Sequence, residues 1–175
     1  MIRYRLAGPG LGLALLASCT TPAPVAKPVA SVTPPQVPVA VTPPRDWRDA
    51  PLTTGTWRYV PGTPRSYAAY GVAGAQPALV IACDKTARTI AILRQGTATS
   101  LTVTTSYGAA TLPAGGLSHE GQMMTGVQIM ARDNLLDRVG YSRGRFAVSG
   151  AGLSPVIVPA WAEPSRAIED CRQAP

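Results

Sequence analysis

Prolines set the first limit on what this chain can fold into. Eight of them lie between Thr20 and Arg45, namely Pro22, Pro24, Pro28, Pro34, Pro35, Pro38, Pro43 and Pro44. Proline fixes φ and lacks an amide donor, so neither a helix nor an inner strand is expected across such a run. The composition predicts an extended, semi-rigid linker over residues 19–45. A single folded domain is therefore expected from residue 46 to residue 175, a length sufficient for a hydrophobic core.

The segment before the linker has the layout of an export signal. Arg3 and Arg5 precede an apolar run from Leu6 to Leu16, and small residues follow. This order is typical of a secretory signal peptide, here residues 1–18. The run is too short to span a bilayer, which takes about 20 apolar residues.

The end of this signal, Leu16-Ala17-Ser18-Cys19, resembles the cleavage site of bacterial lipoproteins. The resemblance implies cleavage before Cys19, diacylglycerol on its thiol and acylation of the new amine. The membrane would then be a partner through these acyl chains, palmitate among them. Thr20 stands where inner-membrane lipoproteins carry Asp, which favours the outer membrane, on its periplasmic side. An ordinary signal peptide with a coincidental cysteine is the alternative.

The charge excludes one class of partner. The net charge is +7 and falls to +5 once Arg3 and Arg5 are removed with the signal peptide. The arginines are scattered and form no basic run, so no nucleic-acid partner is expected. A mild excess of this kind favours weak attraction to anionic lipids or cell-wall carboxylates, screened beyond about 8 Å at physiological salt.

Two cysteines remain if Cys19 carries lipid. Cys83 and Cys171 form an even pair in an exported chain, and an oxidising compartment favours a disulfide between them. A bridge closing so long a loop stabilises by roughly 4–5 kcal/mol in the chain-entropy account. Two buried thiols or half of a metal site are the alternatives. A single histidine and the lack of a Cys-x-x-Cys motif argue against metal.

Strand patterns dominate the domain. Apolar runs and alternations bounded by turn residues predict strands over 56–60, 66–71, 78–83, 89–93, 100–105, 109–112, 127–130, 145–149 and 155–158. The run Ala78–Cys83 is continuously apolar, as in a buried central strand, and it is predicted to pair with Thr89–Leu93 as a hairpin. The Gly-rich stretch Leu112–Gln122 is predicted to be a loop.

Two short helices complete the expected fold. Asp133 is a suitable N-cap for a helix over 134–139, and Pro164 suits the first turn of a final helix over Ser165–Cys171. The sequence therefore predicts a mainly β domain, an antiparallel β-sandwich-like fold with two short helices. A disulfide would join the last helix to the central strand.

No catalytic site is expected. His119 is the only histidine and lies in the Gly-rich stretch, where an imidazole is poorly positioned for catalysis. A triad of Ser142, His119 and Asp133 lacks any known nucleophile motif. No cofactor and no metal site are predicted, since calcium needs six or more oxygen ligands and no Asp-rich loop occurs.

Arg143 and Arg145 are the leading candidates for a site. Two guanidiniums around Gly144 can bind a carboxylate or phosphate, and both point to one face if Arg145 begins a strand. The alternative, which is preferred, is an ion pair with an acid of the final helix: Glu163, Glu169 or Asp170. Trp161 is expected to fill the core, with stacking on a sugar as its other possible role.

Several segments together resemble a known family. They are Trp57-Arg58-Tyr59, Cys83-Asp84, Arg132–Asp137, Tyr141–Val148, Pro159–Glu163 and Ile168–Arg172. The pattern is similar to that of a family of small, uncharacterised alphaproteobacterial envelope lipoproteins. The layout is also similar to the β-sandwich domains of invasion-associated locus B proteins. Neither resemblance implies an activity.

The expected function is that of a lipid-anchored envelope protein that is not an enzyme. It would act as a non-catalytic binding or assembly module for an envelope protein or for peptidoglycan. The alternative is an envelope hydrolase acting on cell-wall or lipid esters, which would require a pocket that unites His119 with an acid or hydroxyl. A purely structural role in a larger assembly is a third reading.

Overall fold

The computed structural model describes residues 46–173; the predicted signal peptide, Cys19 and the Pro-rich linker lie outside them. The order of elements is β1 (Thr56–Val60), β2 (Arg65–Gly71), β3 (Leu79–Asp84), β4 (Thr89–Arg94), β5 (Ser100–Thr105), β6 (Gly108–Pro113), β7 (Gly115–His119), β8 (Gln122–Met130), α1 (Asn134–Gly140), β9 (Arg145–Gly150), β10 (Leu153–Pro159) and α2 (Ala162–Gln173).

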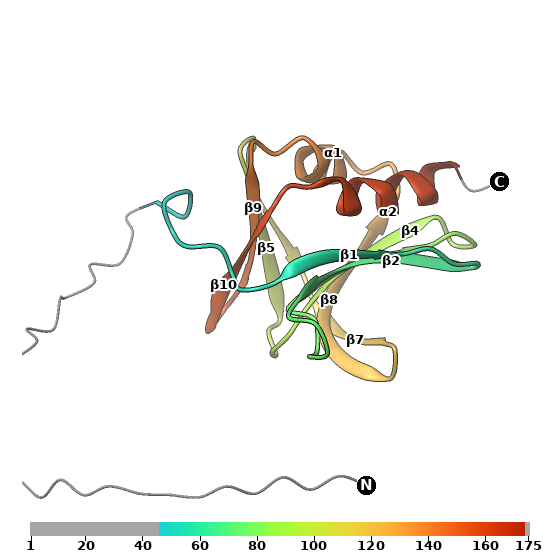
Figure 1. Cartoon of the computed structure of the whole chain (residues 1–175), viewed down its shortest axis with the longest axis horizontal. Helices are drawn as coiled ribbons and strands as arrows, with labels where there is room; N and C mark the ends of the chain where they lie inside the picture. The colour runs from blue at the N-terminus through green and yellow to red at the C-terminus, as the bar shows by residue number, and fades with distance from the viewer. Residues whose placement is uncertain (1–45, 174–175) are drawn as a thin grey trace, which may run out of the picture. The chain divides into compact units, whose positions relative to one another are not determined.

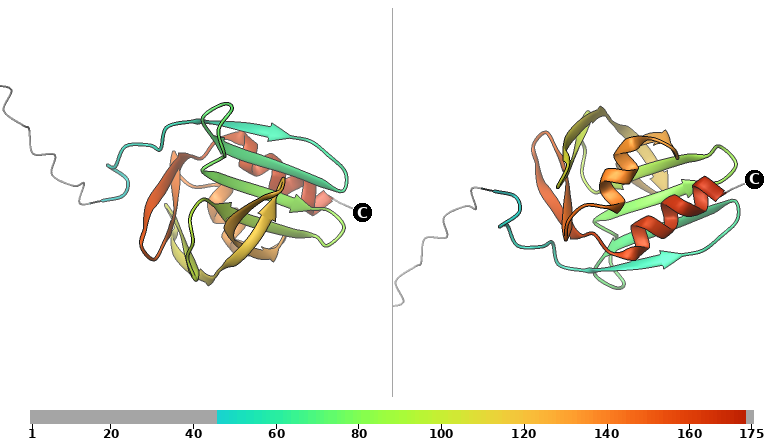
Figure 2. Two further views of the ribbon diagram at one scale, coloured as in Figure 1. Left: turned by 90° about the horizontal axis from the view of Figure 1, so that it is seen from below. Right: turned by 90° about the horizontal axis from the view of Figure 1, so that it is seen from above.

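The strands form two antiparallel sheets. Six strands pair in the order β1-β2-β3-β4-β8-β7, and four pair in the order β10-β9-β5-β6 (Figure 1). Both helices lie on one side of the six-stranded sheet, as the two views of Figure 2 agree. The domain is mainly β and β-sandwich-like, so the predicted fold class is confirmed.

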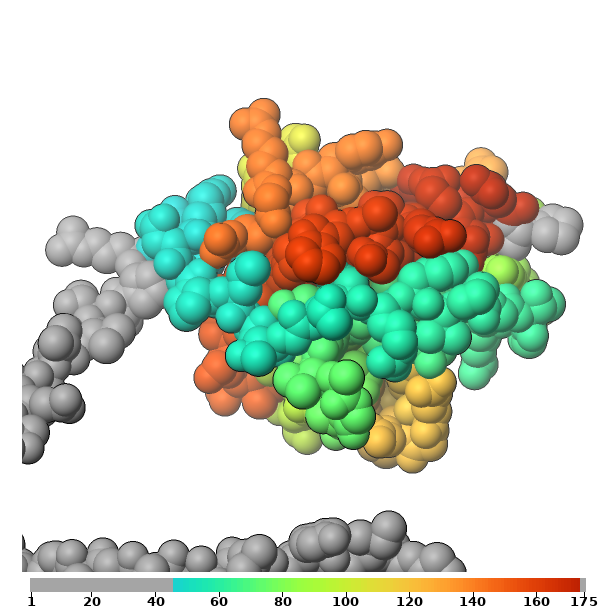
Figure 3. Space-filling view, viewed as in Figure 1, coloured from blue at the N-terminus to red at the C-terminus, as the bar shows by residue number. Residues whose placement is uncertain are grey.

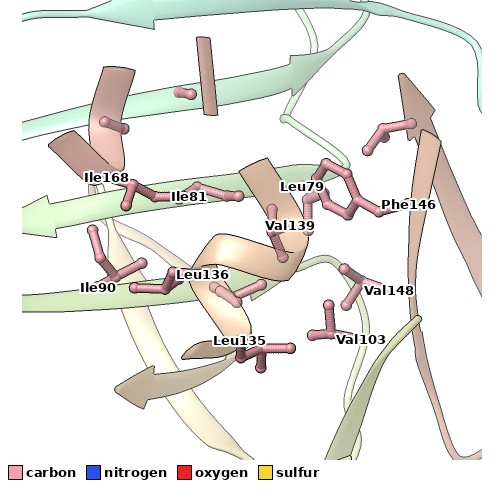
Figure 4. Close-up of a cluster of buried hydrophobic side chains, with 14 of the residues drawn as sticks. Leu79, Ile81, Ile90, Val103, Leu135, Leu136, Val139, Phe146, Val148 and Ile168 are labelled. Atoms are coloured by element: carbon pink, nitrogen blue, oxygen red, sulfur yellow. The ribbon is translucent and has the colours of Figure 1, made fainter. Parts of the chain in front are cut away.

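The predicted hairpin of β3 and β4 forms the centre of the larger sheet. Side chains alternate between its faces, because successive residues of a strand point to opposite sides. Ile81 pairs with Ile92 and Cys83 with Ile90, and all four are buried on the helix-facing side. Figure 4 shows Ile81 and Ile90 beside Ile168 of α2, within the main core.

Trp57 of β1 joins the two sheets. Its ring contacts Tyr70 edge-on at 5.2 Å and stacks on Phe146 of the smaller sheet at 6.2 Å. Its indole N–H donates to the carbonyl of Pro159 at 2.8 Å. A buried indole is therefore fully satisfied at the point where the sheets meet.

A buried cation also ties the sheets together. Arg94, at the end of β4, is only 6% exposed and forms no salt bridge within residues 46–173. Its guanidinium donates to the carbonyls of Val148 (3.2 Å) and Ser154 (3.0 Å), both from the smaller sheet. Burial lowers the pKa of Arg94 from its ordinary value. The hydrogen bonds to carbonyls take the place of a salt bridge at this position.

The two helices begin as their sequences indicate, with one difference. The Asp133 side chain accepts a hydrogen bond from the Leu135 amide at 2.8 Å, as a helix cap does. The last helix is longer than predicted and begins at Ala162, so Pro164 falls within its first turn. Neither helix of the described domain is long and apolar enough to cross a membrane.

The prediction of a loop over residues 112–122 is wrong. Most of this stretch belongs to β7 and the start of β8, which pair as a hairpin at the sheet edge. The hairpin turns at Glu120 and Gly121, whose φ angles are 49° and 78°. Two successive positive φ values make the tight turn whose twist suits an antiparallel pair. The strand escapes prediction because β7 begins with two glycines, which are rare in strands and common in loops.

Candidate functional site

The structure brings Cys83 and Cys171 to disulfide distance. Their sulfurs lie 2.16 Å apart and their Cα atoms 5.5 Å apart, a separation that a disulfide requires. Both side chains are buried between β3 and α2. Among residues 46–173 no three His, Cys, Asp or Glu side chains are grouped as metal ligands would be. The pair thus joins the last helix to the central strand.

Within residues 46–173, Arg145 forms none of the ion pairs predicted for it with the acids of the last helix. Its guanidinium donates to the backbone carbonyl of Ala50 at 2.8 Å, and so it holds the segment that precedes β1. Arg143 lies exposed in the connection between α1 and β9, and its backbone amide donates to Ser106 Oγ at 3.0 Å. The Arg145 guanidinium is thus engaged with the backbone, whereas Arg143 lies at an exposed position.

The acids of α2 are engaged elsewhere. Asp170 lies 3.8 Å from Lys85, and Glu169 lies 3.3 Å from Arg172. Glu163 has a buried carboxylate oxygen without a hydrogen-bond partner in the described domain. The predicted link between Arg145 and these acids is wrong because the chain before β1, which the sequence left unassigned, takes the guanidinium instead.

Trp161 does not fill the core. Its side chain, just before α2, is 53% exposed, whereas Trp57 is buried in the core. Stacking on a ligand remains its other predicted role. The exposed position makes Trp161 available for such a contact.

Three connections meet at one end of the smaller sheet. The Ser106 amide donates to Ser142 Oγ at 3.0 Å, which joins the turn between β5 and β6 to the α1–β9 connection. The Ala160 amide donates to the Gly144 carbonyl at 3.1 Å, which adds the β10–α2 connection. Figure 3 shows orange atoms of the α1–β9 region projecting from the molecule at this end.

Three exposed aromatic residues lie on these connections, one on each. Tyr107 is 53% exposed, Tyr141 72% and Trp161 53%, and they are the exposed large aromatic side chains of the described domain. Arg143 lies between them in the chain and is also exposed. We call these four residues the aromatic surface. Tyr, Trp and Arg are the types enriched at the centres of interfaces, because each combines a large contact area with a hydrogen-bonding or charged group.

A second feature lies on the other side of the larger sheet. A half-open hollow of about 150 Å³ is bounded by β2, β3, β4, β7 and β8. Ala82 and Ala91, paired across β3 and β4, line its floor. Leu93 and Leu117 line its sides. We call it the outer hollow, since it faces away from the helices.

His119 lies at the outer hollow and is no loop residue. It ends β7, and its ring contacts Tyr67 edge-on at 4.6 Å. Burial lowers the pKa of His119; Glu120 opposes this shift and Arg65 adds to it. The imidazole is therefore neutral near pH 7. Its Nε2 atom is buried and has no hydrogen-bond partner among the described residues.

Ser142 and Asp133, the other two members of the triad weighed with His119, each have a structural partner elsewhere. Ser142 donates to the Arg145 carbonyl at 2.5 Å and accepts from the Ser106 amide, so its hydroxyl holds the α1–β9 connection. Asp133 caps α1. Ser118 and Thr89 also line the outer hollow; Ser118 alternates with His119 along β7, and Thr89 Oγ1 accepts from Gln128 at 2.7 Å.

No protein-family model, no curated protein and no solved structure matches the chain. The function is therefore inferred from the aromatic surface and the outer hollow. Sequence reasoning found Arg143 and Trp161 but missed Tyr107 and Tyr141. Their common feature, a large aromatic in a turn beside Gly or Ser, was a signal that alternation analysis does not use.

Proposed function

We propose that this protein is a lipid-anchored, non-catalytic binding module of the cell envelope, and that its aromatic surface binds peptidoglycan. One observation carries the proposal: the exposed large aromatics of the described domain, Tyr107, Tyr141 and Trp161, lie on connections that meet at one end. Arg143 lies among them. An exposed aromatic cluster of this kind is typical of an interaction surface.

The chemistry of the aromatic surface suits a wall polymer. Rings of Trp and Tyr stack on the apolar faces of sugars, and their polar atoms stay in water. The guanidinium of Arg143 suits the carboxylates of wall peptides, since arginine binds carboxylates with two parallel hydrogen bonds. The net positive charge of the chain favours the same partner.

The anchor is proposed from Leu16-Ala17-Ser18-Cys19. The similarity to small alphaproteobacterial envelope lipoproteins supports an outer-membrane location with the domain in the periplasm. Several acyl chains anchor stably, at about 0.8 kcal/mol per buried methylene, whereas one chain anchors weakly. Cys19→Ser should therefore release the protein from membranes or stall its processing. Mass spectrometry that finds the mature chain unacylated at Cys19 would contradict this part of the proposal.

Binding is tested by co-sedimentation of the full chain, kept in detergent, with purified peptidoglycan sacculi. A triple variant, Tyr107→Ser, Tyr141→Ser and Trp161→Ser, should lose most of its binding, because stacking is removed while the fold is retained. The matched control replaces Met123 and Met130 by Ser, since both are exposed on the other sheet, at 68% and 61%. Equal retention of the triple variant and the control would refute the assignment.

A protein partner is the other outcome of interest. Protein interfaces use the same residue types. Two results together would point to a protein partner. The wild-type chain would not sediment with sacculi, and in crosslinked membranes an envelope protein would be captured by the wild type and the control but not by the triple variant. The aromatic surface would then bind protein, and the peptidoglycan assignment would be wrong.

One observation favours the alternative, an envelope hydrolase acting on cell-wall or lipid esters. The outer hollow is lined by His119 together with two residues that carry a hydroxyl, Ser118 and Thr89. No hydrogen bond joins either hydroxyl to the imidazole in the described domain, and Thr89 Oγ1 accepts from Gln128 at 2.7 Å. Hydrolysis of p-nitrophenyl acetate that is abolished by His119→Gln would establish this alternative; a rate equal in both proteins would remove it.

A further inference from the structure

The two sheets end in four edge strands, β1 and β7 in the larger sheet and β10 and β6 in the smaller one. At β10 the chain before β1 takes the edge groups: the Thr53 amide donates to the Ile157 carbonyl at 2.8 Å, and the Ile157 amide donates to Thr53 Oγ1 at 3.0 Å. β1 carries the exposed Arg58, and β7 begins with two glycines. A charge on an edge strand hinders pairing with another chain, and glycines weaken a strand.

β6 differs from the other three edges. Its sequence, GAATLP, contains no charged residue, and its six residues pair with β5 without a register shift. Gly108, Ala109, Thr111 and Pro113 are exposed, and the proline stands last in the strand. An edge without charge or cover can add a strand from another chain, because its outward amides and carbonyls are unpaired. β6 is therefore a candidate site for strand addition.

The register shows which backbone groups of β6 point away from the sheet. The Ala114 amide donates to the Thr99 carbonyl at 2.9 Å, and the direction of hydrogen bonding alternates along an antiparallel pair. The backbone groups of Leu112 therefore face β5, whereas those of Ala109 and Thr111 point outward. Within residues 46–173, no other segment accepts a hydrogen bond from these two amides.

One face of β6 also has apolar surface left to bury. Ala110 and Leu112 lie on the same face, because they are two residues apart in a strand. Both pack against the main core, yet both are only half-buried. In the described part of the chain, no strand lies beyond β6 in this sheet. A further strand at this edge would cover them.

We propose that β6 pairs with β6 of a second copy of this chain, antiparallel and about a two-fold axis at Thr111. Thr111 then lies opposite its own counterpart, and Ala109 lies opposite Pro113 of the second copy. Both outward amides meet a carbonyl, and Pro113, which has no amide to donate, supplies only its carbonyl. Ala110 lies opposite Leu112 of the second copy, so that each strand covers the half-buried apolar face of the other.

A second copy is the occupant that the charge of the chain and the side chains of β6 favour. The net charge is +7, so two copies can approach most easily along a strip without charge, and β6 is such a strip. Opposed threonines are a favourable cross-strand pair. An axis at Ala110 would instead place Leu112 opposite Gly108 and leave it uncovered. The pairing goes beyond the proposed function and does not depend on what the aromatic surface binds.

Cysteine crosslinking in intact envelopes tests the axis. In Thr111→Cys the two Cα atoms would lie about 5.5 Å apart, within the range of a disulfide. Ala109→Cys is the matched control: this position is also exposed on the same strand, but its two copies would lie about 14 Å apart. Mild oxidation should give a covalent dimer from Thr111→Cys and little from Ala109→Cys. No dimer from Thr111→Cys, or equal yields from the two variants, would overturn the proposal.

A charge at the axis should separate the two copies. Thr111→Lys places like charges opposite each other and should raise the Kd of the dimer about tenfold or more, measured by sedimentation of the full chain in detergent. Thr111→Val loses the same hydroxyl, with its 2.8 Å contact to Thr102, but adds no charge and should remain dimeric. A monomeric wild-type chain, or equal Kd values for the two variants, would contradict the proposal. So would crosslinks from Thr111→Cys to a different envelope protein alone, because β6 would then receive another strand.

Discussion

The two faces of the six-stranded sheet use the same strands for opposite purposes. On the inner face, Ile81, Ile90 and Ile92 are fully buried under the helices and the smaller sheet. On the outer face a second apolar cluster, Ala69, Val80, Leu93 and Met124, covers part of the same strands, and the hollow lies beside it over Ala82 and Ala91. Because side chains alternate, a change at one position affects one face and leaves the other nearly untouched. Stability and ligand space are therefore separable in this sheet.

The largest loss of stability is expected when a buried side chain of the inner face is truncated. Ile81→Ala should lower the free energy of unfolding by about 2–5 kcal/mol, because it leaves a cavity in a packed core. Leu117→Ala, at a half-buried position that packs against the smaller apolar cluster of the outer face, should cost less, about 1–2 kcal/mol. Urea unfolding of both variants measures the difference. Equal losses would mean that the two faces are not energetically distinct.

A bridge between Cys83 and Cys171 would stabilise the packing of α2 on the inner face of the sheet. Cys171→Ala should destabilise the domain by about 2–5 kcal/mol, in line with the loss of a native bridge. Adding reductant to the wild-type chain during urea unfolding should reproduce most of this loss. Thiol labelling of the denatured, unreduced chain is the check: modification of both Cys83 and Cys171 would show that no bridge forms.

A smaller effect should separate the two arginines. Arg145→Ala removes a hydrogen bond to the Ala50 carbonyl and should cost about 1 kcal/mol. Arg143→Ala, at an exposed position, should stay within about 0.5 kcal/mol. Thermal melting of the two variants beside wild type tests this order. The reverse order would mean that Arg143 has a structural partner and is not a binding group.

The smallest effect is a pH dependence from the outer face. Burial lowers the pKa of His119 in the folded state, while the unfolded chain takes up its proton near pH 6.5. Stability should therefore be highest above pH 6.5 and should fall as the pH drops toward the folded-state pKa. His119→Gln should remove this part of the pH dependence. An imidazole titration with its midpoint above 6.5 would contradict the direction of the shift.

The sequence predicted the inner face better than the outer one. The continuous apolar run of β3 and the alternation of β4 indicate burial without any knowledge of partners, and the strand positions there are confirmed. His119 and the outer hollow depend on a hairpin whose turn, Glu120-Gly121, lies in a Gly-rich stretch. A hollow arises from register between strands, and a single sequence does not specify which alanines will face each other.

The arginine and tryptophan predictions failed for a related reason. Arg145 contacts Ala50, a residue far away in the chain and outside any predicted element. Trp161 stands between two alanines and Trp57 between Thr56 and Arg58, yet only Trp57 lies buried where the two sheets meet. The partner of Arg145 and the burial of each tryptophan both depend on contacts between segments that are distant in the chain. A local sequence pattern carries no information on such contacts.

Photo-crosslinking in intact envelopes tests the central claim, the binding of peptidoglycan by the aromatic surface, most directly. A photoreactive phenylalanine analogue is placed at Tyr141 and, as a matched control, at Met123 on the other sheet; both positions are exposed. After irradiation and muramidase digestion, the Tyr141 position should yield adducts that carry muropeptide masses, and the Met123 position should not. Adducts of equal yield at both positions, or adducts at Tyr141 with protein alone, would contradict the account.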